Sequence, residues 1–211
     1  MKVLIISGGD LGAPGWIKKN LPPYDYIICA DGGIRHLNLL GVNADLIVGD
    51  FDSAPKDMLE DFKKSGTPII TYPVDKDKTD TQIAVDLAIE KGATQVYLLG
   101  ALGTRWDHSF GNIMLLYRLE KNGVKAQILH SNNIIMLSNK VIKIDGNIGQ
   151  IVSLLPFAGN VHISSTEGLK YPIFDKTLPQ DFPIGVSNVL IASQATINIK
   201  SGWLIVVLAQ D

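Results

Sequence analysis

The sequence predicts a parallel α/β domain followed by an all-β domain, and three observations support this division. Short apolar runs alternate with stretches of helical spacing in residues 1–128, as expected for a parallel sheet with crossover helices. Residues 129–211 instead contain short Ile- and Val-rich runs separated by Gly, Asn and Pro, which is typical of a sandwich or barrel. Charge also changes, from 14 Lys and Arg with 16 Asp and Glu in residues 1–125 to 5 and 5 in residues 126–211. We therefore place the boundary near Gln127–Asn133.

The strands of the first domain are predicted from continuous apolar runs, which indicate strands buried on both faces. These runs are Val3–Ile6, Tyr26–Ala30, Leu46–Val48, Ile69–Tyr72 and Val96–Leu99. Apolar residues spaced three or four apart predict the helices between and after them, at Ile34–Leu40, Ile83–Glu90 and Ile113–Leu119.

The second domain is predicted to consist of strands, because no amphipathic stretch of helix length stands out in it. Its apolar runs are Asn133–Leu137, Gln150–Leu155, Asn160–Ser164, Ala195–Lys200 and Trp203–Leu208.

Composition narrows the class of protein. With 46% hydrophobic and 19% charged residues, the 211-residue chain is typical of a globular protein. A net charge of −2 gives no general attraction to nucleic acid or to anionic membranes, so we expect neither as a partner. Cys29 is the single cysteine, which excludes a disulfide within the chain and a cysteine-based zinc site. Met1–Ser7 reads as a first strand rather than a signal peptide, and no apolar run reaches the roughly 18 residues of a membrane span. We expect a cytoplasmic protein.

Polar residues of the first domain gather where predicted strands end. The four segments are Asp31–Gly33, Gly49–Ser53, Asp75–Asp80 and Gly100–His108, which follow the second to fifth strands in order. The carboxyl ends of parallel strands share one edge of the sheet, and open α/β folds bind ligands at that edge. The sequence therefore predicts one site built from four loops.

Carboxylates in these loops indicate a divalent cation. Asp50 and Asp52 lie two residues apart, and Asp75, Asp77 and Asp80 follow the next strand. Carboxylate oxygens suit Mg²⁺, which shares its coordination sphere with substrate phosphates. Without a cation, these carboxylates would repel each other and any polyphosphate.

Basic residues and glycines in the same loops suit phosphate. Lys76, Lys78 and Arg105 can neutralise phosphate oxygens, and Arg offers a planar fork of donors. Gly32 and Gly33 allow backbone amides to approach an anion closely.

Structural alternatives exist for several of these residues. Asp50-Phe51-Asp52 could be a solvated turn, Asp77 surface charge, and Asp31 the start of a Gly-Gly turn. Thr79 and Gln82 fit a capping box, which would place Asp80 in the first turn of a helix, where an acid is favourable in any case. Asp107 could likewise be an acid at a helix N-terminus, beside a His108 whose ring is hydrogen-bonded within the fold. We interpret Cys29 as a core residue and His36, His130 and His162 as structural.

The ordered set of motifs resembles the thiamine pyrophosphokinase family. The matching segments are Ala30–Gly33 (ADGG), Gly49–Ser53 (GDFDS), Asp77–Asp80 (DKTD), Gly100–His108 (GxxGxRxDH), Gly111-Asn112 and Gly185–Asn188 (GVSN). The resemblance implies an N-terminal parallel, Rossmann-like α/β domain (1–128) that binds ATP and magnesium. It also implies a C-terminal β-sandwich (129–211) for thiamine binding and dimerisation. The reaction it implies converts ATP and thiamine to AMP and thiamine diphosphate, in a homodimer that holds thiamine between its subunits.

The same resemblance implies a role for each matching residue. Asp50, Asp52 and Asp80 would bind Mg²⁺ and, with Arg105, carry catalysis. Asp31, Gly32, Gly33, Lys76, Asp77 and Arg105 would surround the triphosphate of ATP. Asp107 and His108 would contact thiamine, with Ser187 and Asn188 contributed by the partner subunit.

Three other functions remain open on the residues alone. A phosphate-handling hydrolase could use Asp50 as a nucleophile, and a nucleotide sensor could bind ATP without turnover. A nucleotide-sugar transferase could also hold its metal on Asp50 and Asp52, although the Gly100–His108 segment fits that function poorly.

Overall fold

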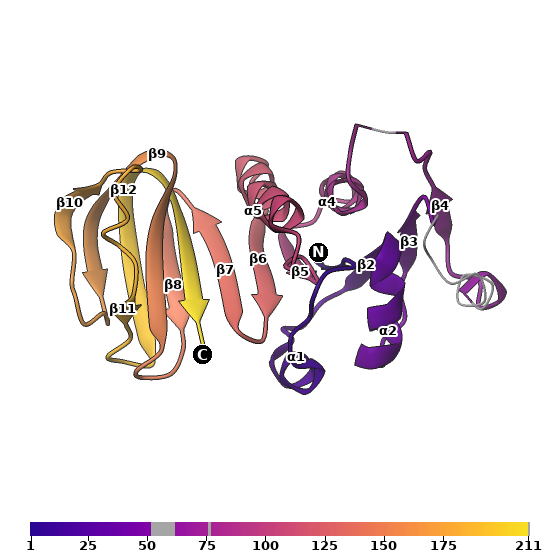
Figure 1. Cartoon of the computed structure of the whole chain (residues 1–211), viewed down its shortest axis with the longest axis horizontal. Coiled ribbons are helices and arrows are strands. Elements are labelled where there is room, and N and C mark those ends of the chain that lie inside the picture. The colour runs from indigo at the N-terminus through magenta and orange to yellow at the C-terminus, as the bar shows by residue number, and fades with distance from the viewer. Residues whose placement is uncertain (52–61, 76, 211) are drawn as a thin grey trace. The chain divides into compact units, whose positions relative to one another are not determined.

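The computed structural model describes residues 1–51, 62–75 and 77–210 (Figure 1). Two of the predicted site residues, Asp52 and Lys76, lie outside these ranges. The chain divides into two compact units, Met1–Ser131 and Asn132–Asp211.

Unit 1 contains a parallel sheet, as the apolar runs predicted. Its described strands are β1 (Lys2–Ile6), β2 (Tyr26–Ala30), β3 (Leu46–Gly49), β4 (Ile69–Thr71), β5 (Gln95–Leu99) and β6 (Lys125–His130). They lie in the order β4-β3-β2-β1-β5-β6, with every neighbouring pair parallel. Val3–Ile6 of the central strand β1 are completely buried, because helices cover both faces of the sheet.

The helices of unit 1 flank this sheet on both faces. Those with described bounds are α1 (Pro14–Asn20), the 3₁₀ turn η1 (Asp31–Gly33), α2 (Ile34–Leu40), α4 (Asp80–Glu90) and α5 (Trp106–Lys121). In Figure 1, α4 and α5 lie on one side of the strands and α1 and α2 on the other. The predicted apolar face of α2 is buried, and Gly41 ends this helix with a φ of 71°, the left-handed conformation that glycine adopts at low cost. Among the described residues, none of these helices is long and apolar enough to cross a membrane.

Unit 2 is built around two long antiparallel strands. Its strands are β7 (Asn133–Ser138), β8 (Val141–Asp145), β9 (Ile151–Glu167), β10 (Phe174–Leu178), β11 (Asn188–Val189) and β12 (Gln194–Ala209). One half of β12 pairs with β7 and the other half with β8, while β9 runs along the whole length of β12. β11 and β10 pair with the two halves of β9 in the same way.

The long strands bend in the middle, which corrects the prediction of separate short runs. The predicted runs Gln150–Leu155, from Ile151 on, and Asn160–Ser164 belong to β9, and Ala195–Lys200 and Trp203–Leu208 belong to β12. The register between the two strands shifts between Asn198 and Trp203, close to Gly159 (φ 131°) and Gly202 (φ 89°). Glycine thus marks bulges that bend a continuous strand here, rather than strand ends.

Both halves of the bent strands contribute to one core, which makes unit 2 a sandwich. Val152 and Leu154 of one half of β9 belong to the same buried cluster as Val161 and Ile163 of its other half. Residues from both halves of β12 complete the cluster. This arrangement confirms the predicted β-sandwich.

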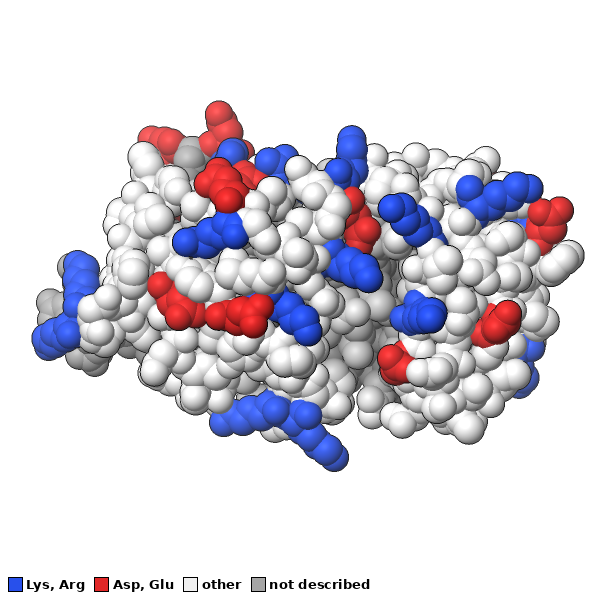
Figure 2. All heavy atoms as spheres, turned by 180° about the vertical axis from the view of Figure 1, so that it is seen from behind, with Lys and Arg blue, Asp and Glu red and all other residues white. Residues whose placement is uncertain are grey.

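Charged side chains are mixed on the surface. On the face shown in Figure 2, the basic and acidic residues are interspersed over each unit, in agreement with the net charge of −2.

Candidate active site

A cavity opens at the carboxyl ends of the central strands of unit 1. From β1 the chain builds β2, β3 and β4 to one side and then crosses to β5 and β6 on the other. Such a change of direction leaves a crevice beside the first strand, which is the usual ligand site of open α/β sheets. The cavity has a volume of about 720 Å³ and is lined by the segments after β1, β2 and β5 and by the starts of α4 and α5.

The floor of the cavity is backbone packed against backbone. Gly9 donates its N–H to Gly100 O at 2.7 Å, and Asp10 donates to Leu102 O at 2.6 Å. A Cβ atom on Gly9 would lie 2.3 Å from Leu102 O, and one on Gly33 would lie 2.2 Å from Ile6 O. Only glycine therefore allows the segments after β1, β2 and β5 to meet this closely.

Three of the predicted carboxylates lie close enough for their negative charges to affect one another. Asp31 directly follows β2 and has a φ of 37°, and within the described ranges its Oδ1 is buried without a hydrogen-bond partner. Burial raises the pKa of the Asp31 carboxyl, and the negative charges of Asp80 and Asp50 raise it further. The backbone N–H groups of Gly32 and Phe51 act in the opposite direction on this pKa. The structure thus brings Asp31, Asp50 and Asp80 within electrostatic range of one another.

Asp80 lies both in the first turn of a helix and at the cavity. It is the first residue of α4, and the Thr79 hydroxyl caps this helix by accepting from Gln82 N at 3.1 Å. Asp80 also lines the cavity. The helix cap therefore fixes the position of the carboxylate at the site.

These carboxylates have the chemistry that a Mg²⁺ ion requires, but they do not complete a metal site by themselves. Among the residues that the structure describes, no three acidic, His or Cys side chains are grouped tightly enough to hold an ion. The buried, unsatisfied Oδ1 of Asp31 and the mutual repulsion with Asp50 and Asp80 are features that a cation would relieve. Asp52, the other carboxylate predicted for this site, lies outside the described residues.

Two of the three basic residues predicted to neutralise phosphate, Lys78 and Arg105, have acidic partners. Lys78 Nζ contacts Asp86 at 2.9 Å, on α4. Arg105 makes a two-pronged contact with Asp107, at 2.6 Å from Nη2 and 3.3 Å from Nε, and both side chains are exposed. This contact lowers the pKa of Asp107 and raises the pKa of Arg105. Arg105 lines the cavity, as does His108, whose Nε2 lies 4.0 Å from Asp107.

Two residues of α2 at the cavity were not predicted as site residues. Arg35 Nη2 donates to Gly8 O and, at 3.5 Å, to Gly9 O. His36, interpreted as structural, is 6% exposed, and its Nε2 lies 2.7 Å from the same Gly9 O. Because a carbonyl oxygen can only accept, the ring N–H donates this hydrogen bond, and burial lowers the pKa of His36. The sequence did not indicate these two residues, because the predicted site residues lie in loops after strands. Arg35 and His36 instead lie inside helix α2, after the Gly-Gly turn.

Ser187 and Asn188 belong to unit 2. Asn188 is buried, and its side chain bonds both backbone groups of Tyr171, accepting from N at 3.0 Å and donating to O at 2.7 Å. Ser187 has a φ of 61°, and its N–H donates to Ser153 Oγ at 3.2 Å. Asn188 therefore shapes the loop that presents the exposed Ser187.

Models of two domain families match the chain. The thiamin pyrophosphokinase catalytic domain matches residues 17–128, and the thiamin pyrophosphokinase vitamin B1 binding domain matches residues 139–204. The chain belongs to the thiamin pyrophosphokinase family. The thiamine pyrophosphokinase of Bacillus subtilis is 31% identical over 166 residues, which cover 77% of each chain. Thiamine pyrophosphokinase 1 of Oryza sativa is 28% identical over 200 residues, 82% of this chain and 74% of the relative.

Solved thiamin pyrophosphokinase structures have the same fold. The crystal structure from Bacillus subtilis superposes over 100% of both chains with a TM-score of 0.89 and 27% identity. That from Geobacillus thermodenitrificans covers 100% of this chain and 98% of its own, with a TM-score of 0.84 and 26% identity. The cavity residues from Ala30 to Asn112 fall within the match to the family's catalytic domain, and Ser187 and Asn188 fall within the match to its vitamin B1 binding domain.

Proposed function

We propose that the protein transfers the pyrophosphoryl group of ATP to the hydroxyl of thiamine, giving thiamine diphosphate and AMP. The observation that carries this proposal is the match of both domain families, catalytic and vitamin B1 binding, in one chain. The cavity of unit 1, with its glycine floor and converging carboxylates, supplies the features that a nucleotide and its cation need.

The reaction is a displacement at the β-phosphorus. The thiamine hydroxyl oxygen forms a bond to this phosphorus, and the bond to the oxygen that bridges the α- and β-phosphates breaks. AMP leaves with the electron pair of that bond. The hydroxyl proton passes to a nearby carboxylate, Asp80 or Asp107, or to water. Transfer of this kind depends mainly on alignment and on neutralising phosphate charge.

We propose Asp50, Asp52 and Asp80 as the ligands of Mg²⁺. When bound, the ion would neutralise phosphate oxygens and orient the triphosphate. Asp31 lies within electrostatic range of Asp50 and Asp80, with Gly32 and Gly33 in the same turn. Lys76, Asp77 and Arg105 are proposed to complete the triphosphate site, and for Arg105 this requires release from its exposed contact with Asp107. An ion pair between exposed side chains is screened by water and contributes little stability, so this release costs little.

The thiamine site is proposed to lie between the subunits of a homodimer. Asp107 and His108 of one subunit, with Ser187 and Asn188 of the partner, would hold the vitamin. Unit 1 offers a surface for such association, because Trp106, Phe110 and Met114 are exposed at intervals of four residues on one face of α5. The rings of Trp106 and Phe110 lie 6.1 Å apart.

A reducing compartment such as the cytoplasm is the proposed location. Cys29 is buried in β2, and burial raises the pKa of its thiol, so it remains an unreactive core residue.

The direct test is to incubate the purified protein with ATP, MgCl₂ and thiamine and to separate the products by chromatography. We expect AMP and thiamine diphosphate in equal amounts, with neither formed when thiamine is omitted. ADP with thiamine monophosphate, or phosphate release without thiamine, would refute the proposal. A phosphoenzyme trapped on Asp50 would point instead to a hydrolase.

A further inference from the structure

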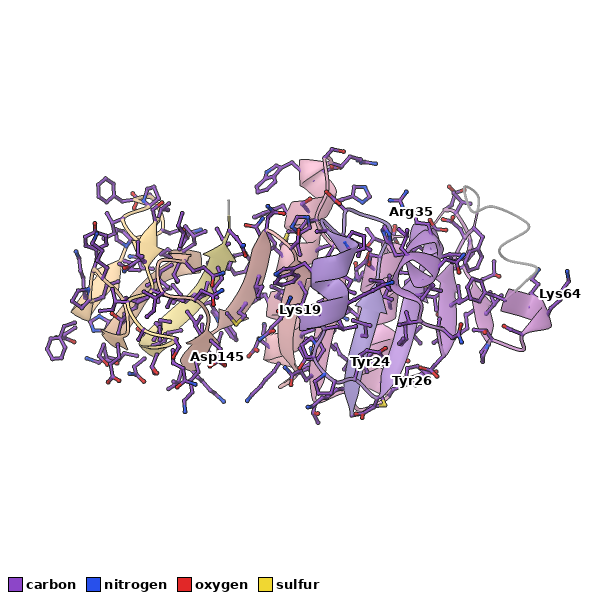
Figure 3. All side chains as sticks on the ribbon, turned by 90° about the horizontal axis from the view of Figure 1, so that it is seen from below. Lys19, Tyr24, Tyr26, Arg35, Lys64 and Asp145 are labelled. Atoms are coloured by element: carbon purple, nitrogen blue, oxygen red, sulfur yellow. The ribbon has the colours of Figure 1, made fainter. Side chains whose placement is uncertain are left out.

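Arg35 lies outside the family motifs, and the structure brings it to the cavity. It lies in the first turn of α2, and its side chain reaches back to the end of β1, where Nη2 donates to Gly8 O and Gly9 O. Figure 3 shows it at the edge of unit 1 opposite Tyr26, the first residue of β2. Its guanidinium therefore stands at the carboxyl-end edge of the sheet, beside the cavity. We propose that Arg35 binds the phosphate chain of the nucleotide.

The charge of Arg35 is available for a ligand. The predicted cations Lys78 and Arg105 have carboxylate partners at 2.9 Å and 2.6 Å. Within the described ranges, the acceptors of Arg35 are two backbone carbonyls, and no carboxylate lies within ion-pair distance of it. Neutral acceptors fix the guanidinium without cancelling its charge, so the cavity retains a full positive charge at this point.

The carbonyl contacts also hold the side chain ready. An arginine has five N–H donors in a rigid plane, and both carbonyls are reached from Nη2. Nε and Nη1 remain for a phosphate, and a tethered side chain loses less conformational entropy when it binds one.

The same contacts remove an obstacle to anion binding. The carbonyl oxygens of Gly8 and Gly9 would repel phosphate oxygens if they were bare in the cavity. Arg35 covers both, and His36 also donates to Gly9 O, at 2.7 Å. The acidic residues Asp31 and Asp80 on the same cavity make this compensation necessary for a polyanion.

The test compares binding of ligands that differ only in their phosphates. Arg35→Gln and wild type are titrated with adenosine, AMP, ATP and inorganic tripolyphosphate, in MgCl₂, by isothermal titration calorimetry. We expect Arg35→Gln to weaken ATP and tripolyphosphate roughly 10- to 100-fold, the loss of a charge-assisted hydrogen bond, and adenosine less than about 2-fold. Arg35→Lys should fall between, because an ammonium group cannot reach carbonyl and phosphate as a planar fork does.

Arg118→Gln is the matched control. It removes the same charge from α5, where Arg118 pairs with Asp86 at 2.7 Å, and it should leave the affinity for every ligand unchanged. Thermal unfolding of each variant verifies that it is folded.

Two results would overturn the inference: unchanged affinity for ATP and tripolyphosphate in Arg35→Gln, or an equal loss for adenosine, which would mean that the loop had merely loosened. The identity of the nucleotide rests on the proposed function, but the tripolyphosphate titration does not. Binding that depends on Arg35 in a protein that makes no AMP from ATP and thiamine would support the phosphate contact and refute the proposed reaction.

Discussion

Gly9→Ala tests whether backbone contact between the segments after β1 and β5 builds the cavity. The added methyl group would lie 2.3 Å from Leu102 O and 2.5 Å from Gly100 O. Both atoms are backbone, so neither can rotate away as a flexible side chain would. The segments must move apart, and this movement stretches the hydrogen bonds from Gly9 N to Gly100 O and from Asp10 N to Leu102 O, now 2.7 Å and 2.6 Å long.

The expected loss of stability follows from these contacts. Overpacking in a closely packed region costs about 1–3 kcal/mol. Two weakened hydrogen bonds add about 1 kcal/mol each. We therefore expect the free energy of unfolding of Gly9→Ala to fall by about 3–5 kcal/mol, and ATP binding to weaken because the floor of the cavity is displaced.

Urea unfolding followed by circular dichroism measures the stability, and calorimetric titration with ATP measures the site. Gly15→Ala is the control, because a Cβ at Gly15 in α1 meets nothing within 4 Å. That variant should be unchanged or stabilised by up to about 1 kcal/mol. If the free energy of unfolding of Gly9→Ala is also within about 0.5 kcal/mol of the wild-type value, and if this variant binds ATP normally, the backbone packing described here is wrong.

Three further changes test the proposed roles of individual residues. Asp52→Asn should reduce turnover by orders of magnitude while the thermal midpoint stays unchanged; near-normal turnover would remove Asp52 from the metal site. Ser187→Ala should raise the KM for thiamine more than the KM for ATP, with the exposed Ser201→Ala as control, and equal effects on both would argue against a thiamine contact. Asp31→Asn should stabilise the protein at pH 7 without divalent cations or nucleotide. The raised pKa of Asp31 means that wild-type stability falls as pH rises from the ordinary 3.8 through the raised value, a loss that Asn avoids. Urea unfolding at pH 7 and at pH 3.5 should therefore show a gain at the higher pH and little difference at the lower, and a gain independent of pH would contradict this account.

The sheet of unit 1 could be predicted from the sequence because its strands are buried on both faces. Tyr26–Ala30 appears as an apolar run and is strand β2 with the same bounds. Thr79 was likewise recognised as a helix cap from its position three residues before Gln82, and the hydrogen bond is present. These patterns depend only on residues that are neighbours in the sequence, so they can be recognised without knowledge of the rest of the fold.

Other elements gave no local signal. Helix α1 is seven residues long, begins at Pro14 and buries only Ile17, which is too little for a periodic pattern. Strand β8 alternates buried and exposed residues over five positions, and β10 buries Leu178 alone, so neither forms an apolar run. Arg35 was missed for a different reason, because its contacts with Gly8 and Gly9 join segments 26 or 27 residues apart in the sequence.

Backbone strain and carboxylate burial together indicate how the site exchanges stability for binding. Among the described residues other than glycine, positive φ angles occur at Asp31, Phe51 and Ser187, each inside a family motif, and otherwise at Ala158 and Asp175. Such conformations cost on the order of 1 kcal/mol each and persist where the surrounding structure imposes them. At Asp31 the strain coincides with burial and with repulsion from Asp50 and Asp80. A ligand carrying positive charge would relieve that repulsion only in the folded state, so the proposed cation would gain affinity from the cost that the free protein holds at Asp31.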